Sequence, residues 1–185
     1  MTEKIPSFET ERLIVREVRE ADGPAYEKYF VNYEVIRYLA AGVPWPYPKG
    51  SASEFIRTMI APRQGIDKWM WAITLKESNC ALIGAIELSR EATPSNRGFW
   101  LGEPFWGKGY MMEAVSPVTD YAFEVLGFEK LIFANAVGNA RSRRIKEKSG
   151  ASFLRREPGS YMDPQFMETE LFELTSDTWK ARTLR

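Results

Sequence analysis

Hydrophobic and polar residues alternate in short stretches along the chain, the pattern of a β-strand with one buried face. This alternation predicts strands over residues 12–18, 69–75, 81–88, 97–102, 130–137, 152–156 and 168–174. Asn79 stands between the second and third stretches and marks a turn. Those two strands are therefore expected to form a hairpin.

Other stretches carry apolar residues at the spacing of a helix with one buried side. They predict one or two helices over residues 21–38, and further helices over residues 51–59, 110–126 and 139–149. Gly127 and Gly150 follow the last two helices and are natural C-terminal stops. Prolines at alternate positions across residues 43–48 predict a loop there. The order of the elements predicts an α/β fold, a mixed sheet with helices on both faces.

The size and composition suit one domain over residues 1–185, because 44% of the residues are hydrophobic and can form a core. Lys+Arg and Asp+Glu are both 25, so the chain lacks the overall basic charge that would hold nucleic acid or an anionic membrane. No stretch approaches the roughly 20 apolar residues of a membrane span. The lone cysteine, Cys80, has no reactive signature and can form no internal disulfide, so we expect a cytoplasmic protein.

The chain contains no histidine. This excludes Ser-His-Asp triads, Cys-His pairs and metal sites built on histidine. Acid–base chemistry must therefore come from Glu, Asp, Tyr, Lys, Ser or the backbone. Because the chain also has a single cysteine, too few ligands remain for a zinc-type site, and we expect no metal.

A predicted strand, a glycine turn and a predicted helix follow one another, and residues 104–110 read PFWGKGY. Free N–H groups at a helix start bind anions, and glycines let the backbone approach a phosphate closely. The turn is not a Walker loop, because Lys108 is followed by Gly109 rather than by Ser or Thr. It is not a dinucleotide fingerprint, because Met112 replaces the third glycine. On the glycines alone, an ordinary strand-to-helix turn is the better explanation.

The helix predicted over residues 139–149 carries a second polar pattern. Asn139 stands at the N-cap position, where capping alone would explain it. Ser142 follows in the first turn, where a solvated side chain is ordinary. Basic residues recur from Arg141 to Lys148, which is typical of a solvated helix face, although they would also suit a ligand rich in phosphate.

Several segments, in order along the chain, resemble the GNAT superfamily of N-acetyltransferases, and within it the RimJ/RimL-type branch. They are similar to its opening strand, a loop before its third helix, a central strand and its coenzyme A loop: Glu9–Arg16 (ETERLIVR), Pro44–Tyr47 (PWPY), Leu82–Ile86 (LIGAI) and Trp106–Ala114 (WGKGYMMEA). The spacing of its second motif is matched by Asn139, Ser142, Glu147, Lys148 and Gly150. The resemblance covers roughly residues 8–174, and the agreement of several co-linear segments makes it specific.

The resemblance implies a GNAT-like acyl-CoA N-acyltransferase fold, with a central, mostly antiparallel sheet in which strands 97–103 and 130–137 splay apart. It implies that acetyl-CoA is the co-substrate, with its pantetheine arm in the gap and its pyrophosphate on the amides of residues 105–110. The residues expected to bind it are Trp100, Leu101, Gly102, Phe105, Trp106, Gly107, Lys108, Gly109, Tyr110, Asn139 and Ser142. The chain departs from the family at Pro104, where many relatives carry Gln or Arg, so the amides would hold the phosphates without that side chain.

The resemblance also implies the reaction, in which a primary amine attacks the acetyl thioester directly in a ternary complex. Ser142, with Asn139 beside it, is the implied hydrogen-bond donor or proton relay to the leaving sulfur. Many relatives use a tyrosine as this acid, and the matching position here is Lys146. Glu87 is our candidate for the general base, because it interrupts an apolar strand where a carboxylate is costly unless paired or reactive. A strand-end glutamate near a cleft is an equal alternative.

Aromatic residues are expected at two kinds of place. Trp45 and Tyr47 lie in the proline-rich loop and are expected to line the amine entrance. Trp69, Trp71 and Trp100 fall in predicted strands and are expected in the core.

The expected function is N-acetyl transfer to a primary amine, either a protein N-terminus, such as that of a ribosomal protein, or a small molecule. The alternative is a non-catalytic acyl-CoA-binding module. The departures from the family pattern at Lys146 and Pro104 favour this alternative, whereas the presence of Asn139 and Ser142 argues against it. A nucleoside-phosphate-binding regulator would rest on the helix-start anion site alone. The expected partners are acetyl-CoA and the amine, without nucleic acid or membrane, and a homodimer remains open.

Overall fold

The computed structural model describes residues 5–78, 81–92 and 95–183 and contains two β-sheets with antiparallel pairing. The first sheet has the order β1-β2-β3-β4-β5 and the second β6-β8-β7. The strands are β1 (Phe8–Glu9), β2 (Leu13–Glu17), β3 (Lys68–Leu75), β4 (Leu82–Ser89), β5 (Arg97–Leu101), β6 (Lys130–Ala136), β7 (Ser152–Pro158) and β8 (Glu168–Thr175). The strands predicted from the alternation are confirmed, whereas β1 was not predicted. Asn79 and Cys80 lie outside the described residues.

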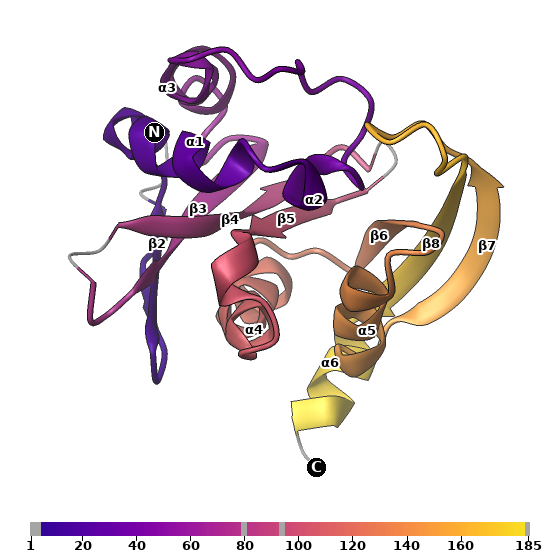
Figure 1. Ribbon diagram of the computed structural model, residues 1–185. Coiled ribbons are helices and arrows are strands. Elements are labelled where there is room, and N and C mark those ends of the chain that lie inside the picture. The colour runs from indigo at the N-terminus through magenta and orange to yellow at the C-terminus, as the bar shows by residue number, and fades with distance from the viewer. Residues whose placement is uncertain (1–4, 79–80, 93–94, 184–185) are drawn as a thin grey trace.

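The helices cover both faces of the first sheet, as predicted. They are α1 (Gly23–Phe30), α2 (Tyr33–Ile36), α3 (Ser51–Phe55) with a π-helical turn (Ile56–Ile60), α4 (Tyr110–Glu124), α5 (Ala140–Lys148) and α6 (Ser176–Thr183), with short 3-10 turns at Glu20–Asp22 and Glu103–Phe105. Figure 1 shows α1–α3 above the first sheet, α4 below it, and α5 with α6 beside the second sheet. The sequence analysis did not predict α6. In the described part of the chain, every helix is too short or too polar to cross a membrane.

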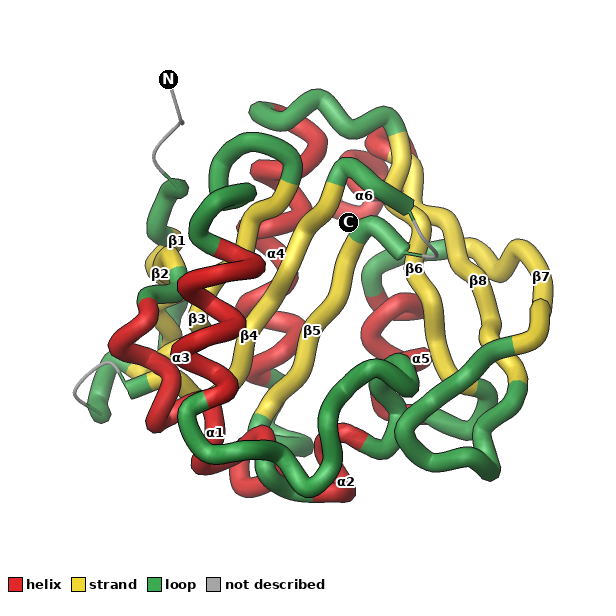
Figure 2. Tube along the Cα trace, turned by 90° about the horizontal axis from the view of Figure 1, so that it is seen from above, coloured by secondary structure: helices red, strands yellow, loops and turns green. Residues whose placement is uncertain are grey.

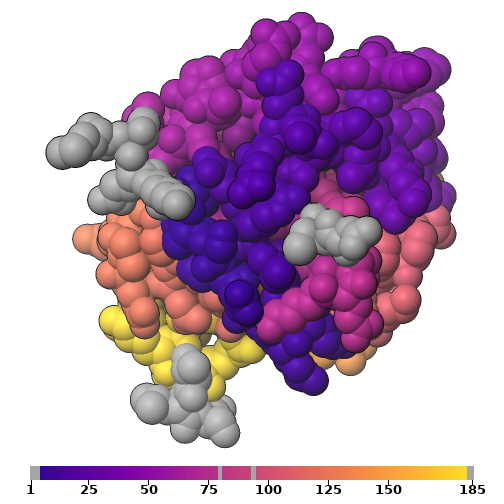
Figure 3. Space-filling model, turned by 90° about the vertical axis from the view of Figure 1, so that its left-hand side faces the viewer, coloured from indigo at the N-terminus to yellow at the C-terminus, as the bar shows by residue number. Residues whose placement is uncertain are grey.

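Alternate residues of the central strands face two separate parts of the core, because side chains alternate across a strand. Met70 and Ala72 of β3 pack with α1–α3, whereas Trp71 and Ile73 pack with α4. Trp69, Trp71 and Trp100 are buried, which confirms their predicted place. Viewed from the side of β2, Figure 3 shows the indigo N-terminal residues lying against the purple helical layer, with the yellow C-terminal helix at the lower edge.

Strands β5 and β6 meet at one end and separate toward the other. The amide of Asn96 donates to the carbonyl of Ile132 (2.8 Å), and the amide of Ile132 donates to Oδ1 of Asn96 (2.9 Å). Beyond this point the two strands belong to different sheets, and Figure 2 shows them spreading apart. The predicted splayed pair is therefore present, and it divides the molecule between its two sheets.

Candidate active site

A cavity of about 1040 Å³ lies where β5 and β6 separate. Its walls come from residues 97–101 of β5, residues 134–136 of β6, the turn before α4 and one side of α5. Residues of α2 and of the β7–β8 connection line the cavity on another side. The cavity therefore joins the turn that the sequence marks as an anion site to a part of the molecule that the sequence left unassigned.

The turn before α4 exposes a run of backbone amides. Gly107 (φ +75°) and Gly109 (φ +83°) both line the cavity in the left-handed conformation that glycine adopts most easily. The first backbone bond within α4 runs from the amide of Glu113 to the carbonyl of Gly109, so the preceding amides of the helix are left for a ligand.

The predicted anion site spanned residues 105–110, and the structure shortens it at one end. The amides of Phe105 and Trp106 already donate to the carbonyls of Gly102 (3.0 Å) and Glu103 (3.1 Å) in the 3-10 turn. These two amides are therefore committed within the protein. The amides that remain for an anion belong to residues 107–112.

The N-terminal hairpin braces this turn. The guanidinium of Arg12 donates to the carbonyl of Lys108 (2.9 Å) and lies 4.6 Å from the ring centroid of Tyr110. Glu113 accepts hydrogen bonds from Thr10 Oγ1 (2.5 Å) and from the amide of Arg12 (2.8 Å). Burial alone would raise the pKa of Glu113, but the bonds from Thr10 and Arg12 outweigh it and lower that pKa below its ordinary value. The glycine turn is thus held by residues about a hundred positions away.

Helix α5 begins as the sequence predicts. Oδ1 of Asn139 accepts a hydrogen bond from the amide of Ser142 (3.2 Å), which confirms Asn139 as the N-cap. Both residues line the cavity. Basic side chains of the same helix also line it: Arg141, Arg144 and Lys148. This end of the cavity therefore combines free amides with positive charge, which suits phosphate groups.

One basic residue of α5 does not belong to a solvated face. Lys146 is 3% exposed, and its Nζ donates to Ser142 Oγ (2.6 Å) and to Asn135 Oδ1 (3.2 Å). Burial, and then the positive charge of Arg97, lowers the pKa of Lys146 well below its ordinary value, while Glu170 acts in the opposite direction. The sequence pattern did not reveal this burial.

Another side of the cavity is lined by polar residues that the sequence analysis missed. They include Glu34 and Tyr38 near α2, and Glu157 and Tyr161 near the β7–β8 connection. The hydroxyls of Tyr161 and Thr169 are 2.6 Å apart; burial raises the pKa of Tyr161, and this hydrogen bond opposes the shift. Because these segments lie far apart in sequence and carry no motif, no local signal could have brought them together.

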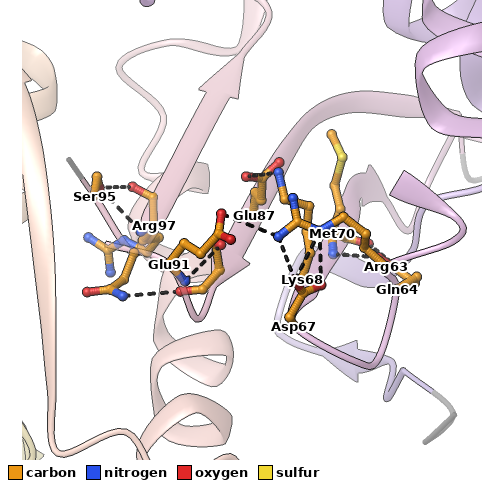
Figure 4. A network of polar contacts seen from close by, with 11 residues as sticks. Arg63, Gln64, Asp67, Lys68, Met70, Glu87, Glu91, Ser95 and Arg97 are labelled. Atoms are coloured by element: carbon orange, nitrogen blue, oxygen red, sulfur yellow. Dashed lines mark hydrogen bonds and ion pairs between the residues drawn. The ribbon is translucent and has the colours of Figure 1, made fainter. Parts of the chain in front are cut away.

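Some predicted site residues lie outside the described cavity wall. Nζ of Lys68 is 2.9 Å from Oε1 of Glu87, whose side chain is 28% exposed, and Figure 4 shows this ion pair, with Arg97 extending away from it. Trp45 is 43% exposed and lies 5.8 Å from the Tyr33 ring, and Tyr47 packs on Phe30 (5.3 Å). Gly102 and Lys108 also lie outside the wall. The other predicted residues all line it: Trp100, Leu101, Phe105, Trp106, Gly107, Gly109, Tyr110, Asn139 and Ser142.

Within the described residues, no group of three or more His, Cys, Asp or Glu side chains is placed to hold a metal ion. The cavity wall instead offers amides, basic side chains and the aromatic rings of β5 and the turn. Its size and chemistry fit a long molecule with phosphates at one end.

Residues 12–152 match the family described as "Acetyltransferase (GNAT) domain". That match covers most of the chain, and with the fold and the cavity it identifies an acyltransferase. The protein belongs to the GNAT acetyltransferase family.

Individual relatives agree with this assignment. The chain is 30% identical over 148 residues to YoaA of Bacillus subtilis (strain 168), described as an uncharacterized N-acetyltransferase, and the match covers 78% of this chain and 82% of YoaA. The solved ribosomal-protein-S5-alanine acetyltransferase of Vibrio fischeri has a TM-score of 0.77 at 18% identity, covering 94% of this chain and 98% of that one. RimL, a ribosomal L7/L12 alpha-N-protein acetyltransferase solved with coenzyme A, has a TM-score of 0.75 at 17% identity, covering 95% and 99%. At these identities the two structures show a shared fold.

Proposed function

We propose that this protein transfers an acetyl group from acetyl-CoA to a primary amine. The observation that carries the proposal is the single cavity between β5 and β6, which joins an anion-binding turn to a separate polar region. A phosphate-bearing donor and an amine acceptor can therefore meet in one space. Direct transfer in a ternary complex needs this arrangement, because both substrates must be held close together.

The residues of the proposed coenzyme end have separable tasks. The amides of residues 107–112 and the basic side chains of α5 bind the phosphates. A backbone amide of β5 near Leu101 polarises the thioester carbonyl, since an oriented N–H stabilises the charge that develops there. Ser142 donates a hydrogen bond to the leaving sulfur, and Asn139 holds the helix turn that carries Ser142.

The acceptor end suits a positively charged amine. Glu34 and Glu157 line the cavity, with their carboxylates ion-paired to Arg37 and Arg155, and Tyr38 and Tyr161 add aromatic surface with hydroxyl groups. The relatives named for alanine and alpha-N-protein acetylation support a protein N-terminal amine as acceptor. A small-molecule amine is the other acceptor class.

Deprotonation of the amine needs a base, for which Glu87 stays our proposal. Glu87 pairs across the sheet with Gly98, which lines the cavity, so a water molecule can connect the carboxylate to the amine. The ion pair with Lys68 orients the carboxylate on β4.

An acceptor screen tests the proposed function, with release of free thiol from acetyl-CoA as the readout. It should contain N-terminal peptides, free amino acids, polyamines and aminoglycosides. Each active peptide is compared with the same peptide already acetylated at its N-terminus, which should be inert. Initial rates measured over both substrate concentrations should show a sequential pattern. Binding of acetyl-CoA without acceptor-dependent thiol release would favour the non-catalytic module instead.

A further inference from the structure

Two basic side chains, Arg97 of β5 and Lys146 of α5, are buried in the cavity wall. Lys146 is 3% exposed and Arg97 is 4% exposed, and both residues line the cavity. Lys146 Nζ and Arg97 Cζ lie 5.4 Å and 5.7 Å from the ring centroid of Phe99. In the described part of the chain, neither forms an ion pair with a carboxylate, although buried charges usually require a partner. The pair therefore calls for an explanation.

The shorter hydrogen bond of Lys146 leads to Ser142, which we propose as the donor to the leaving sulfur. Its Nζ donates to Oγ of Ser142, one helical turn earlier, at 2.6 Å. Because that oxygen accepts from Lys146, the hydroxyl hydrogen of Ser142 is left to donate elsewhere. A hydroxyl that accepts a bond from a charged group is also a stronger donor itself. Ser142 lines the cavity, so its hydroxyl hydrogen is available to a molecule bound there.

Asn135 holds the other side of the lysine. Its Oδ1 accepts from Nζ of Lys146 at 3.2 Å, and its own amide donates to the carbonyl of Ala136 at 3.0 Å. Asn135 comes from β6 and Ser142 from α5, so Nζ is fixed between two elements. The lysine is thereby oriented without being neutralised.

Arg97 supplies a permanent positive charge near Lys146. Its guanidinium donates to Thr119 Oγ1 (3.3 Å) and lies 3.8 Å from the ring centroid of Phe133, while Nε and Nη2 have no hydrogen-bond partner among the described residues. Burial lowers the pKa of Arg97 to about 9, so it remains protonated at neutral pH. Its charge opposes protonation of Lys146 and makes the lysine readier to release a proton.

The carboxylate that opposes Arg97 is Glu170 of β8. It favours the charged form of Lys146, but it is itself bound by Arg143 (2.6 Å) and Arg156 (3.1 Å). Its charge is therefore largely balanced by these two arginines. Among the described residues, the charged groups that act on Lys146 are thus Arg97 of β5 and Glu170 of β8, and Glu170 is bound by Arg143 of α5 and Arg156 of β7.

We propose that Lys146 supplies the proton for the departing sulfur of the coenzyme, that the hydroxyl of Ser142 passes it on, and that Arg97 sets how readily Lys146 releases it. This rests on the proposed acetyl transfer. As the carbon–sulfur bond breaks, the sulfur takes the hydrogen of Ser142 Oγ, and that oxygen takes a hydrogen from Nζ of Lys146. Lys146 becomes neutral and regains a proton from solvent, which receives the proton lost by the attacking amine. Lys146 and Arg97 act through Ser142 and are positioning residues.

The pH profile of kcat gives the first test. The relay needs the ammonium form, so kcat should fall as the pH rises through the pKa of Lys146, well below the ordinary range of lysine. Lys146→Met should lower kcat on the order of 10²-fold and abolish this alkaline limb. Lys146→Gln, which keeps a hydrogen bond to Ser142 without a titrating proton, should do the same. Arg97→Met should move the limb to higher pH, because the nearest opposing charge is gone.

A double-mutant cycle gives the second test. If Ser142 and Lys146 form one relay, Ser142→Ala combined with Lys146→Met should cost no more than the larger single effect. If the two residues act independently, the fold losses in kcat of the two single variants should multiply in the double variant. Lys180→Met, on the exposed face of α6, is the matched control and should leave kcat and its pH profile unchanged. Thermal melting and coenzyme affinity show whether each variant is folded, and replacing a buried charge by an apolar side chain is often tolerated.

The outcomes separate the two proposals. A wild-type protein that acetylates no amine in the screen overturns the proposed function. A wild-type protein that turns over, with the alkaline limb unchanged in folded Lys146→Met or Lys146→Gln, overturns the relay alone. Multiplicative losses in the cycle overturn it too.

Discussion

Gly107 offers the sharpest test of the coenzyme site, because its substitution separates backbone strain from ligand contact. The residue has φ +75° and lines the cavity, and a Cβ built on it would meet no heavy atom within 4 Å. Gly107→Ala therefore introduces no clash inside the protein. It should place a methyl group on the surface where we expect a phosphate to approach the amides of residues 107–112.

The magnitudes follow from these two effects. A left-handed conformation costs an alanine about 1–2 kcal/mol, which should lower the melting temperature by roughly 2–8 °C in a protein of this size. Displacing a phosphate from one charge-assisted hydrogen bond costs about 1.5–3 kcal/mol, or roughly 10- to 100-fold in affinity. The affinity loss should therefore be large, while the protein stays folded.

Gly127→Ala is the matched control. Gly127 has φ +67°, a Cβ there would also meet nothing within 4 Å, and the residue lies after α4, outside the cavity wall. It should show the same loss of melting temperature with unchanged coenzyme affinity. Calorimetric titration with coenzyme A and thermal denaturation measure both quantities. Equal affinities in the two folded variants would refute the placement of the phosphates.

Further predictions concern chemistry and stability. Ser142→Ala should lower kcat on the order of 10²-fold with little change in the KM for acetyl-CoA, and full kcat with rate-limiting chemistry would remove Ser142 from the mechanism. Glu87→Gln should reduce kcat without changing the coenzyme affinity measured by calorimetry. If the variant keeps the wild-type kcat, Glu87 has no role in catalysis and serves only its ion pair with Lys68. Glu113→Gln should destabilise the fold by roughly 1 kcal/mol at pH 7. The pKa of Glu113 is lowered in the folded state, so the difference in unfolding free energy between wild type and variant should vanish as the pH falls through that pKa. Denaturation curves that show the same difference at every pH would contradict this prediction. Chelators should leave turnover unchanged, and a loss that one added metal restores would disprove metal independence.

The elements and the glycine turn could be read from the sequence because their causes are local. Period-two and helical spacing reflect which side of a single strand or helix is buried. The N-cap of Asn139 and the turn at Gly107 depend on residues within a few positions of each other. Helix α6 was missed because its pattern is weak: its apolar Trp179 is flanked by polar residues.

Contacts between distant segments could not be read in this way. The bonds from Thr10 and Arg12 to Glu113 hold the glycine turn before α4 across about a hundred positions. Likewise, the pairing of Glu87 with Lys68 depends on the register of β3 and β4. Neither charge pattern nor periodicity encodes such partners, because they follow from how the sheet and helices pack.

The sequence by itself determined most of the strands and helices, the N-cap of α5 and the glycine turn before α4, because each depends on the properties of neighbouring residues. The tertiary structure decided which charged side chains are buried away from water. In sequence, Lys146 is one of several basic residues on a polar helix; packing of α5 against β5 and β6 buries it beside Ser142, Asn135 and Arg97. Burial and the nearby positive charge change how readily it gives up its proton, and both arise only when segments distant in the chain meet.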